Sequence, residues 1–164
     1  MCGIIGIASN KSVTSNIINS LKRLEYRGYD SAGIATISKQ NLNEKKCSGR
    51  VEELEKILFN SPAQGNIGIG HVRWATHGIP SEINAHPHSS EIVSVVHNGI
   101  IENSNLLKNK LEKEGYKFKS QTDTEVITLL ITKYLKDSNP IDAVLKSLEY
   151  LEGSFALGIL FKDQ

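Results

Sequence analysis

The sequence opens with Met1-Cys2-Gly3-Ile4-Ile5-Gly6-Ile7-Ala8, and the interpretation of the whole chain starts from this stretch. If Met1 is removed after translation, Cys2 carries a thiol and a free α-amine on one carbon. The amine titrates near ~7.7 to 8.0 and the thiol near ~8.5, so the amine can accept the thiol proton at neutral pH. This arrangement is typical of an N-terminal nucleophile, which the apolar residues behind it would hold in place as a buried strand. The alternative is an ordinary cysteine on a frayed terminus.

Composition limits the classes of partner. The 164 residues suffice for one domain with its own core. The 19 basic and 18 acidic residues nearly balance, which argues against nucleic acid or an anionic membrane as a partner. The sequence shows no membrane span or signal peptide, and it has only two cysteines, Cys2 and Cys47. We therefore expect free thiols, a structural role for Cys47, and a cytoplasmic location.

Hydrophobic periodicity predicts several elements in the first half of the chain. A helix is expected over residues 13–26, followed by a hairpin of two strands over 31–38 and 43–48. A strand over residues 70–78 ends in polar and aromatic groups. Residues 79–91 lack apolar periodicity and predict a long loop, which in a compact domain is often functional.

The second half predicts a buried strand over residues 92–96 that stops at a sharp turn, Asn98-Gly99. A short strand is expected over 116–119, and Thr122-Asp123-Thr124-Glu125 reads as a capping box that opens a helix. Asn139-Pro140 predicts the start of another helix. Its expected inward side chains are Ile141, Val144, Leu145, Leu148 and Leu151. The alternation of strands and helices is also compatible with a parallel α/β sheet.

Four polar positions complement the thiol of Cys2. Acyl transfer needs donors for the negative charge that develops on the attacked oxygen, and the Asn98 amide with the Gly99 N–H is a suitable pair. Arg73 can hold a carboxylate, and Asp123 can hold an ammonium group. Taken singly, these residues are better explained as a turn, an ion pair and a helix start. Taken together, they describe a pocket for an amino acid whose side chain carries an acyl group.

The histidines suggest two other kinds of site. His86 and His88 form an H-x-H pair, and His71 and His77 are close in sequence. The pattern lacks the second pair of ligands that zinc sites usually show, so we predict no metal site. A dyad of Cys2 with one of these histidines also supplies a base for the thiol, and it remains open.

Several stretches together resemble the class II glutamine amidotransferases, and the resemblance covers the chain nearly end to end. They are CGIIGI (2–7), YRGYDSAGIA (26–35), GHVRWATHG (70–78), NAHPH (84–88), HNGIIEN (97–103) and QTDTE (121–125). The stretches LEYRGYDSAG and RWATHG are most similar to the glutaminase domain of the glutamine–fructose-6-phosphate aminotransferases.

The resemblance implies an α+β fold of the N-terminal nucleophile hydrolase type. This fold is a four-layer αββα sandwich of two mainly antiparallel sheets, here expected to be incomplete at the C-terminus. Residues 2–164 would then be a partial class II glutamine amidotransferase domain that lacks the sugar-isomerase domains. Missing strands would leave a sheet edge and apolar surface uncovered.

The resemblance also implies a reaction. Cys2 would attack the side-chain amide of L-glutamine and form a γ-glutamyl thioester, which water converts to glutamate after ammonia has left. No cofactor or metal is expected. In the full-length enzyme, expected to be a homodimer, the ammonia would convert fructose 6-phosphate to glucosamine 6-phosphate.

The family pattern assigns further roles. Asn98 and Gly99 would form the oxyanion hole, Arg73 would bind the α-carboxylate of glutamine, and Asp123 would bind its α-amine. The remaining positions have roles around these groups. Thr76 and His77 would line the pocket, Trp74 would lie on a mobile closing loop, Arg27 would support the nucleophile, and His86 would lie in the surrounding shell.

Two alternatives stay open. The first is a catalytically silent module that binds glutamine or glutamate through Arg73 and Asp123. The second is the glutaminase domain of another class II amidotransferase, with a purine precursor or aspartate as acceptor. The run Arg73-Trp74-Ala75-Thr76-His77-Gly78 argues against the second.

Overall fold

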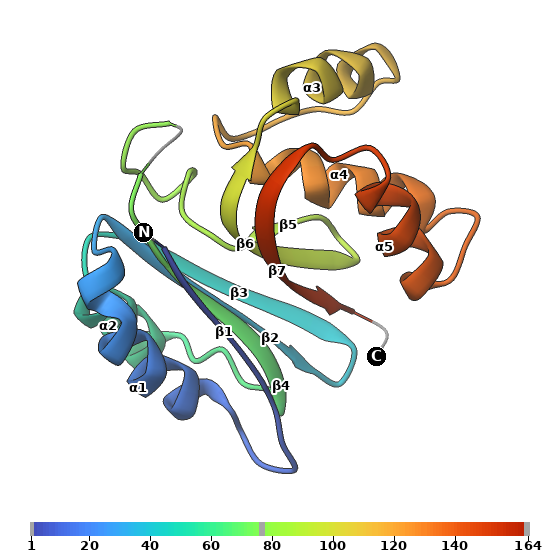
Figure 1. Cartoon of the computed structure of the whole chain (residues 1–164). Coiled ribbons are helices and arrows are strands. Elements are labelled where there is room, and N and C mark those ends of the chain that lie inside the picture. The colour runs from blue at the N-terminus through green and yellow to red at the C-terminus, as the bar shows by residue number, and fades with distance from the viewer. Residues whose placement is uncertain (1, 76–77, 163–164) are drawn as a thin grey trace.

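The computed structural model describes residues 2–75 and 78–162, and Figure 1 shows how their elements are arranged. The strands of this part of the chain are β1 (Gly3–Ala8), β2 (Ser31–Ser38), β3 (Asn41–Ser48), β4 (Ile67–Arg73), β5 (His88–Ser89), β6 (Val93–Ile101) and β7 (Gly153–Phe161). The helices are α1 (Thr14–Leu24), α2 (Val51–Asn60), α3 (Ser104–Lys113), α4 (Thr124–Tyr134) and α5 (Pro140–Leu148), with a 3₁₀ turn at Glu25–Arg27.

The strands form two sheets, one with the order β1-β4-β2-β3 and one with the order β5-β6-β7. All paired neighbours are antiparallel. Helices α1 and α2 lie on the outer side of the first sheet, and α4 and α5 lie on the outer side of the second (Figure 1). The predicted sandwich of two antiparallel sheets between helical layers is confirmed, and a parallel sheet is excluded for the described residues.

Three apolar clusters hold these layers together. Strand β2 contributes to two of them, because successive strand residues point to opposite faces. Ala32 and Ile34 pack beneath α1 and α2, whereas Ala35 and Ile37 lie between the two sheets. The third cluster joins the second sheet to α4. None of the helices in the described ranges has the length and apolar character that a transmembrane segment needs.

Two predicted connections are confirmed. The hairpin of β2 and β3 turns at Lys39 and Gln40, whose φ angles of 49° and 62° match the two-residue turns that follow the twist of a hairpin. At the start of α5, the Asn139 side chain accepts a hydrogen bond from the Asp142 N–H at 3.0 Å. This bond satisfies one of the otherwise unpaired donors of a helix N-terminus.

The predicted sharp turn at Asn98-Gly99 is wrong. Strand β6 continues to Ile101, and Asn98 pairs with Ala156 of β7. Gly99 has a φ of +143°, and a Cβ at this position would lie 2.1 Å from the Ser154 oxygen. The glycine therefore serves a close approach of two strands, and a side chain there would conflict with both the backbone conformation and β7.

The expected strand over 116–119 and the capping box at Thr122–Glu125 are also wrong, for one shared reason. The Glu125 carboxylate accepts hydrogen bonds from the Lys119 N–H at 2.9 Å and the Ser120 N–H at 2.7 Å. These backbone donors are bound by a side chain instead of a neighbouring strand. Glu125 consequently fixes the loop before α4 and does not cap the helix.

Helix α5 packs through a different face than predicted. Ile141 and Leu145 are 71% and 54% exposed, whereas Ala143 and Ser147 are buried. The other side chains expected to point inward, Val144, Leu148 and Leu151, are partly buried. Small side chains thus form the centre of the contact, which apolar periodicity alone does not reveal.

Gly33 of β2 gives a test of how the loop before β5 packs on the first sheet. A Cβ at Gly33 would lie 2.0 Å from the His86 carbonyl oxygen, whereas a Cβ at Gly6 of β1 would meet only Ile69 at 3.9 Å. We expect Gly33→Ala to lower the free energy of unfolding by about 2–3 kcal/mol, because the loop must move away. Gly6→Ala, the matched control, should change it by less than about 0.5 kcal/mol. Equal values in urea unfolding would contradict this packing.

Candidate functional site

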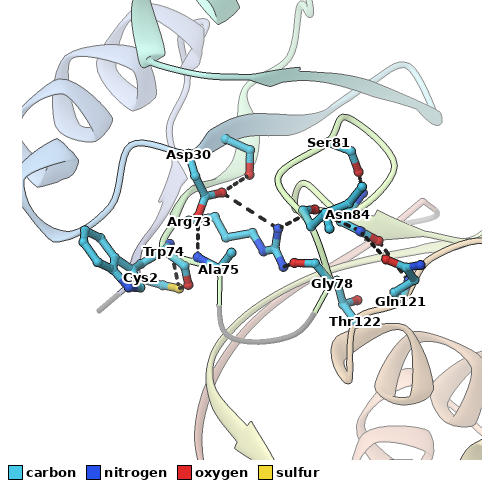
Figure 2. Close-up of polar contacts among 12 residues, drawn as sticks. Cys2, Asp30, Arg73, Trp74, Ala75, Gly78, Ser81, Asn84, Gln121 and Thr122 are labelled. Carbon is cyan, nitrogen blue, oxygen red and sulfur yellow. Dashed lines mark hydrogen bonds and ion pairs between the residues drawn. The ribbon is translucent and has the colours of Figure 1, made fainter.

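Cys2 lies at one end of the first sheet, next to residues from two other strands. It directly precedes β1, which pairs with β4, and β2 pairs with β4 so that Ser31 is opposite Arg73. The start of β1, the end of β4 and the start of β2 therefore meet at the same end of the sheet. Figure 2 shows the result, with Cys2, Asp30 and Arg73 gathered around the segment that follows β4.

Backbone contacts fix the thiol of Cys2. Its Sγ lies 3.6 Å from the Trp74 carbonyl oxygen, to which it donates, and it accepts from the Trp74 N–H at 3.4 Å. The carbonyl of Cys2 accepts from Arg27 Nε at 3.0 Å and from Asn98 Nδ2 at 3.2 Å. The structure thus brings Arg27, Trp74 and Asn98 directly against the candidate nucleophile.

A small cavity of about 20 Å³ adjoins the thiol, and its walls include Cys2, Arg73, Gly99 and Asp123. A volume of this size accommodates about one water molecule. Larger hollows lie elsewhere, one of about 570 Å³ beside β3 and one of about 400 Å³ beside α1, and Cys2 lines neither of them. The chemistry-bearing side chains therefore converge on the smallest of these spaces.

The cavity wall carries one buried cation and one buried anion. Arg73 is 3% exposed, donates from Nη2 to the Gly78 carbonyl at 3.2 Å, and has Nη1 at 3.8 Å from Oδ1 of Asp30. Asp123 is also buried, and its Oδ2 accepts from the Ile101 N–H at 2.8 Å. A guanidinium and a carboxylate in one cavity complement the two charges of a free amino acid.

Four buried histidines form a network near the start of α4, and two of them contact Thr124. His71 donates from Nε2 to the His97 carbonyl at 3.0 Å. The Thr124 hydroxyl lies 2.7 Å from His86 Nε2 and 2.9 Å from His97 Nδ1. The rings of His71 and His86 stack with centroids 4.0 Å apart, and His88 packs edge-on against His86. This network connects β4, β6 and α4 behind the cavity.

Burial keeps three of these imidazoles neutral, those of His71, His86 and His88. It lowers the pKa of His71 to about 3, and it lowers the pKa of His86 and His88 well below 6.5, with the charge of Arg73 adding to the effect. Their hydrogen bonds go to the His97 carbonyl and to the hydroxyls of Thr122 and Thr124. An imidazole whose pKa is held this low is a weak acceptor for a thiol proton.

Thr76 and His77 lie outside the described residues. The Trp74 indole is half exposed and meets the ring of Tyr29 edge-on at 5.8 Å. In the ranges 2–75 and 78–162, no three His, Cys, Asp or Glu side chains are arranged to hold a metal ion.

Sequence reasoning missed two residues of this site, Asp30 and Thr124. Asp30 belongs to the YRGYDSAGIA stretch, but only the pairing of β2 with β4 shows that it lies beside Arg73. Thr124 belongs to the predicted capping box at Thr122–Glu125. The signal that could have found it is the combination of a buried hydroxyl with two histidines, His86 and His97, and this combination depends on tertiary contacts.

Comparison with known proteins identifies relatives over the whole chain. Residues 71–164 match a family model described as the glutamine amidotransferase domain. The chain is similar to the glutamine–fructose-6-phosphate aminotransferase [isomerizing] of Mesorhizobium japonicum, 53% identical over 99% of this chain and 27% of the relative. It is also 53% identical to the protein of that name from Clostridium acetobutylicum, over 98% of this chain and 26% of the relative. The chain thus spans about a quarter of the length of these relatives.

Solved structures agree on the fold. A glutamine phosphoribosylpyrophosphate amidotransferase from B. subtilis, in complex with ADP and GMP, superposes with a TM-score of 0.86 at 29% identity, over 99% of this chain and 35% of that chain. A structure described as the allosteric regulatory enzyme of purine biosynthesis gives a TM-score of 0.87 at 29% identity, over 99% of this chain and 36% of that chain. These likenesses confirm the expected N-terminal nucleophile hydrolase fold.

Proposed function

The chain belongs to the glutamine amidotransferase family, and on this basis we propose that it hydrolyses the side-chain amide of L-glutamine with the Cys2 thiol as nucleophile. The observation that carries the proposal is that Cys2 shares one cavity with a buried guanidinium, that of Arg73, and a buried carboxylate, that of Asp123. Two opposite charges in one cavity suit the α-carboxylate and the α-ammonium group of an amino acid.

Substrate binding then sets the orientation of the reacting amide. Arg73 binds the α-carboxylate of glutamine, and Asp123 binds the α-ammonium group. With both ends of the amino acid fixed, the side chain extends toward Cys2, which replaces random encounter by a fixed approach of thiol and amide. In this proposal Thr76 and His77 line the same pocket, as the family resemblance implies.

The chemical steps follow from the contacts of Cys2. Removal of Met1 exposes the α-amine, which takes the proton from Sγ. The thiolate adds to the amide carbon, and the Asn98 amide and the Gly99 N–H stabilise the negative oxygen. The α-ammonium group of Cys2 returns its proton to the amide nitrogen, which leaves as ammonia, and a γ-glutamyl thioester remains. Water adds to this thioester, the thiol leaves with a proton, and glutamate is released.

The pocket has to open before glutamine can enter. Its volume of about 20 Å³ holds one water molecule, and the Trp74 peptide lies directly on Sγ. We therefore assign Trp74 to a segment that moves aside for the substrate and closes over it. The half-exposed indole, which meets the ring of Tyr29 edge-on, suits such a movement.

The wider role concerns a longer protein. We propose that residues 2–164 form part of its glutaminase domain, and that further domains use the ammonia to convert fructose 6-phosphate to glucosamine 6-phosphate. The relatives of that name, each about four times as long as the chain, support this assignment over a purine precursor as acceptor. We further propose a cytoplasmic homodimer that binds neither nucleic acid nor membrane. The nearly balanced charge supports the exclusion of nucleic acid and membrane, and the two free thiols support the cytoplasmic location. The homodimer rests on the family resemblance.

Labelling with a glutamine-like diazo-ketone tests the function directly. We expect an intact-mass spectrum to show loss of Met1 and one adduct per chain, which peptide sequencing places on Cys2 and which excess glutamine prevents. Cys47 is an internal control, because burial raises the pKa of its thiol to about 11 and it should remain unlabelled. The variant Cys2→Ser should give no adduct.

Glutamate release, measured on the same samples, distinguishes the alternatives. A chain without Met1 that binds glutamine but forms no adduct and releases no glutamate would be the silent binding module. Labelling of Cys47 in place of Cys2 would also contradict the proposed nucleophile.

A further inference from the structure

Asp30 occupies the junction between the segment that carries the substrate arginine and the segment that holds the nucleophile. It directly precedes β2, and its backbone is bound on both sides. The Asp30 N–H donates to the Arg73 carbonyl at 3.2 Å, and the Gly49 N–H donates to the Asp30 carbonyl at 2.7 Å. The position of the Asp30 carboxylate is therefore set by the sheet.

The two carboxylate oxygens of Asp30 have different partners (Figure 2). Oδ1 accepts from the Ser31 hydroxyl at 2.9 Å and lies 3.8 Å from Arg73 Nη1. Oδ2 accepts a hydrogen bond from the Ala75 N–H. One carboxylate thus contacts both the buried guanidinium and the backbone immediately after Trp74.

Each contact of Asp30 involves a segment that touches a proposed reacting or binding group. Arg73 is almost fully buried, so its attraction to Asp30 is only weakly screened by water. The guanidinium lies between this carboxylate and the carbonyls of Gly78 and Ile79. On the other side, the hydrogen bond from the Ala75 N–H holds the backbone that directly follows Trp74. The N–H and the C=O of Trp74 both contact Cys2 Sγ.

We propose that Asp30 is a positioning residue for glutamine hydrolysis. Its charge orients the Arg73 guanidinium toward the α-carboxylate of glutamine, and its bond to the Ala75 N–H holds the Trp74 backbone beside the Cys2 thiol in the closed state of that segment. This inference rests on the function proposed above, since it assigns no chemical step to Asp30 itself. The two roles use different properties of the side chain, its charge and its hydrogen-bond acceptors, and two substitutions separate them.

The first substitution, Asp30→Asn, removes the charge but keeps one oxygen for the Ala75 N–H. We expect the KM for L-glutamine to rise about tenfold or more, because the arginine loses its charged neighbour, while kcat changes less than about threefold. The decisive comparison uses L-glutaminamide, which lacks the α-carboxylate. Its kcat/KM should be nearly the same in Asp30→Asn and wild type, so the preference for glutamine falls about tenfold.

The second substitution, Asp30→Ala, removes the acceptors as well. It should lower hydrolysis of both substrates and release the segment around Trp74. Trp74 is the single tryptophan of the sequence, so its fluorescence anisotropy reports on this segment without a label. We expect the anisotropy to fall in Asp30→Ala and to keep its wild-type value in Asp30→Asn. The matched control is Asp137→Asn, an exposed aspartate after α4, which should change none of these values.

The outcomes separate this inference from the proposed function. If wild type hydrolyses glutamine and Asp30→Asn lowers kcat/KM for both substrates by the same factor, Asp30 has a general structural role and the positioning role is wrong. Unchanged anisotropy in Asp30→Ala likewise contradicts the second role. If wild type hydrolyses neither substrate and Cys2 takes no label, the proposed function fails, and this inference fails with it.

Discussion

Acidification from pH 7.5 to pH 5 is expected to lower the free energy of unfolding by about 6 kcal/mol, which is enough to unfold many domains. The cause is the set of buried histidines His71, His86 and His88. In the unfolded chain they bind protons near pH 6.5. In the folded chain burial holds their pKa values far lower, and the charges of Arg73 and Lys46 add to this.

The sign follows from the protons bound in each state. Between pH 6.5 and the lowered pKa values of the folded state, the unfolded chain binds more protons, so stability is lost as the pH falls below about 6.5. Each histidine contributes about 1.4 kcal/mol per pH unit, so three contribute about 4 kcal/mol per unit. Urea unfolding at a series of pH values, followed by circular dichroism, measures this slope.

A variant isolates the histidine contribution from that of the carboxylates. His88→Gln retains a polar partner for the Thr122 hydroxyl, which lies 2.9 Å from His88 Nε2. We expect this variant to be less stable at pH 7.5 but to have a slope that is smaller by about one third. A slope identical to wild type would show that His88 does not titrate differently in the two states.

Asn98→Ala is expected to reduce kcat for glutamine hydrolysis by about 10²–10³-fold with little change in KM. In the proposed oxyanion hole, Asn98 is a donor that interacts with the attacked oxygen only after negative charge has developed there. An interaction made only in the transition state affects kcat more than substrate binding. Steady-state release of glutamate measures both constants.

Arg27→Ala serves as the comparison for this prediction. In the structure both Asn98 Nδ2 and Arg27 Nε donate to the carbonyl of Cys2. Loss of Arg27 therefore removes one anchor of the nucleophile and leaves the proposed oxyanion hole intact. If the two variants lose kcat equally, Asn98 acts as an anchor of Cys2 and its assignment to the oxyanion hole is wrong.

Local signals predicted most elements of the fold. They failed where the conformation depends on pairing with another strand or on a hydrogen bond from the backbone to a side chain. The hairpin at Lys39-Gln40 and the cap at Asn139 depend on neighbouring residues, and both are readable from sequence. Asn98-Gly99 has the composition of a turn, yet pairing with β7 keeps it in a strand. The carboxylate of Glu125 binds the backbone of Lys119 and Ser120 before α4, and apolar periodicity does not indicate which partner a polar side chain takes.

The site shows the same division. The N-terminal cysteine and the family resemblance directed attention to Cys2, Arg73 and Asp123, and the structure brings them to one cavity. The positions of Asp30 and Thr124 depend on sheet register and on the packing of α4 against the second sheet. Sequence spacing carries no information about either, because the partners are far apart along the chain.

The loop before β5 divides into two parts with opposite tolerance for change. Ile79 and Ile83 are exposed, whereas residues 84–88 are buried, and the Asn84 side chain binds the Ile79 carbonyl and both the backbone and the side chain of Gln121. A short peptide tag inserted after the exposed Pro80, ahead of the turn in which Ser81 binds the backbone of Asn84 and Ala85, would project into solvent. A single residue inserted after Asn84 would shift the following backbone by one position and separate His86 from Thr124. Two insertions a few residues apart would thus yield a usable labelled protein and a misfolded one.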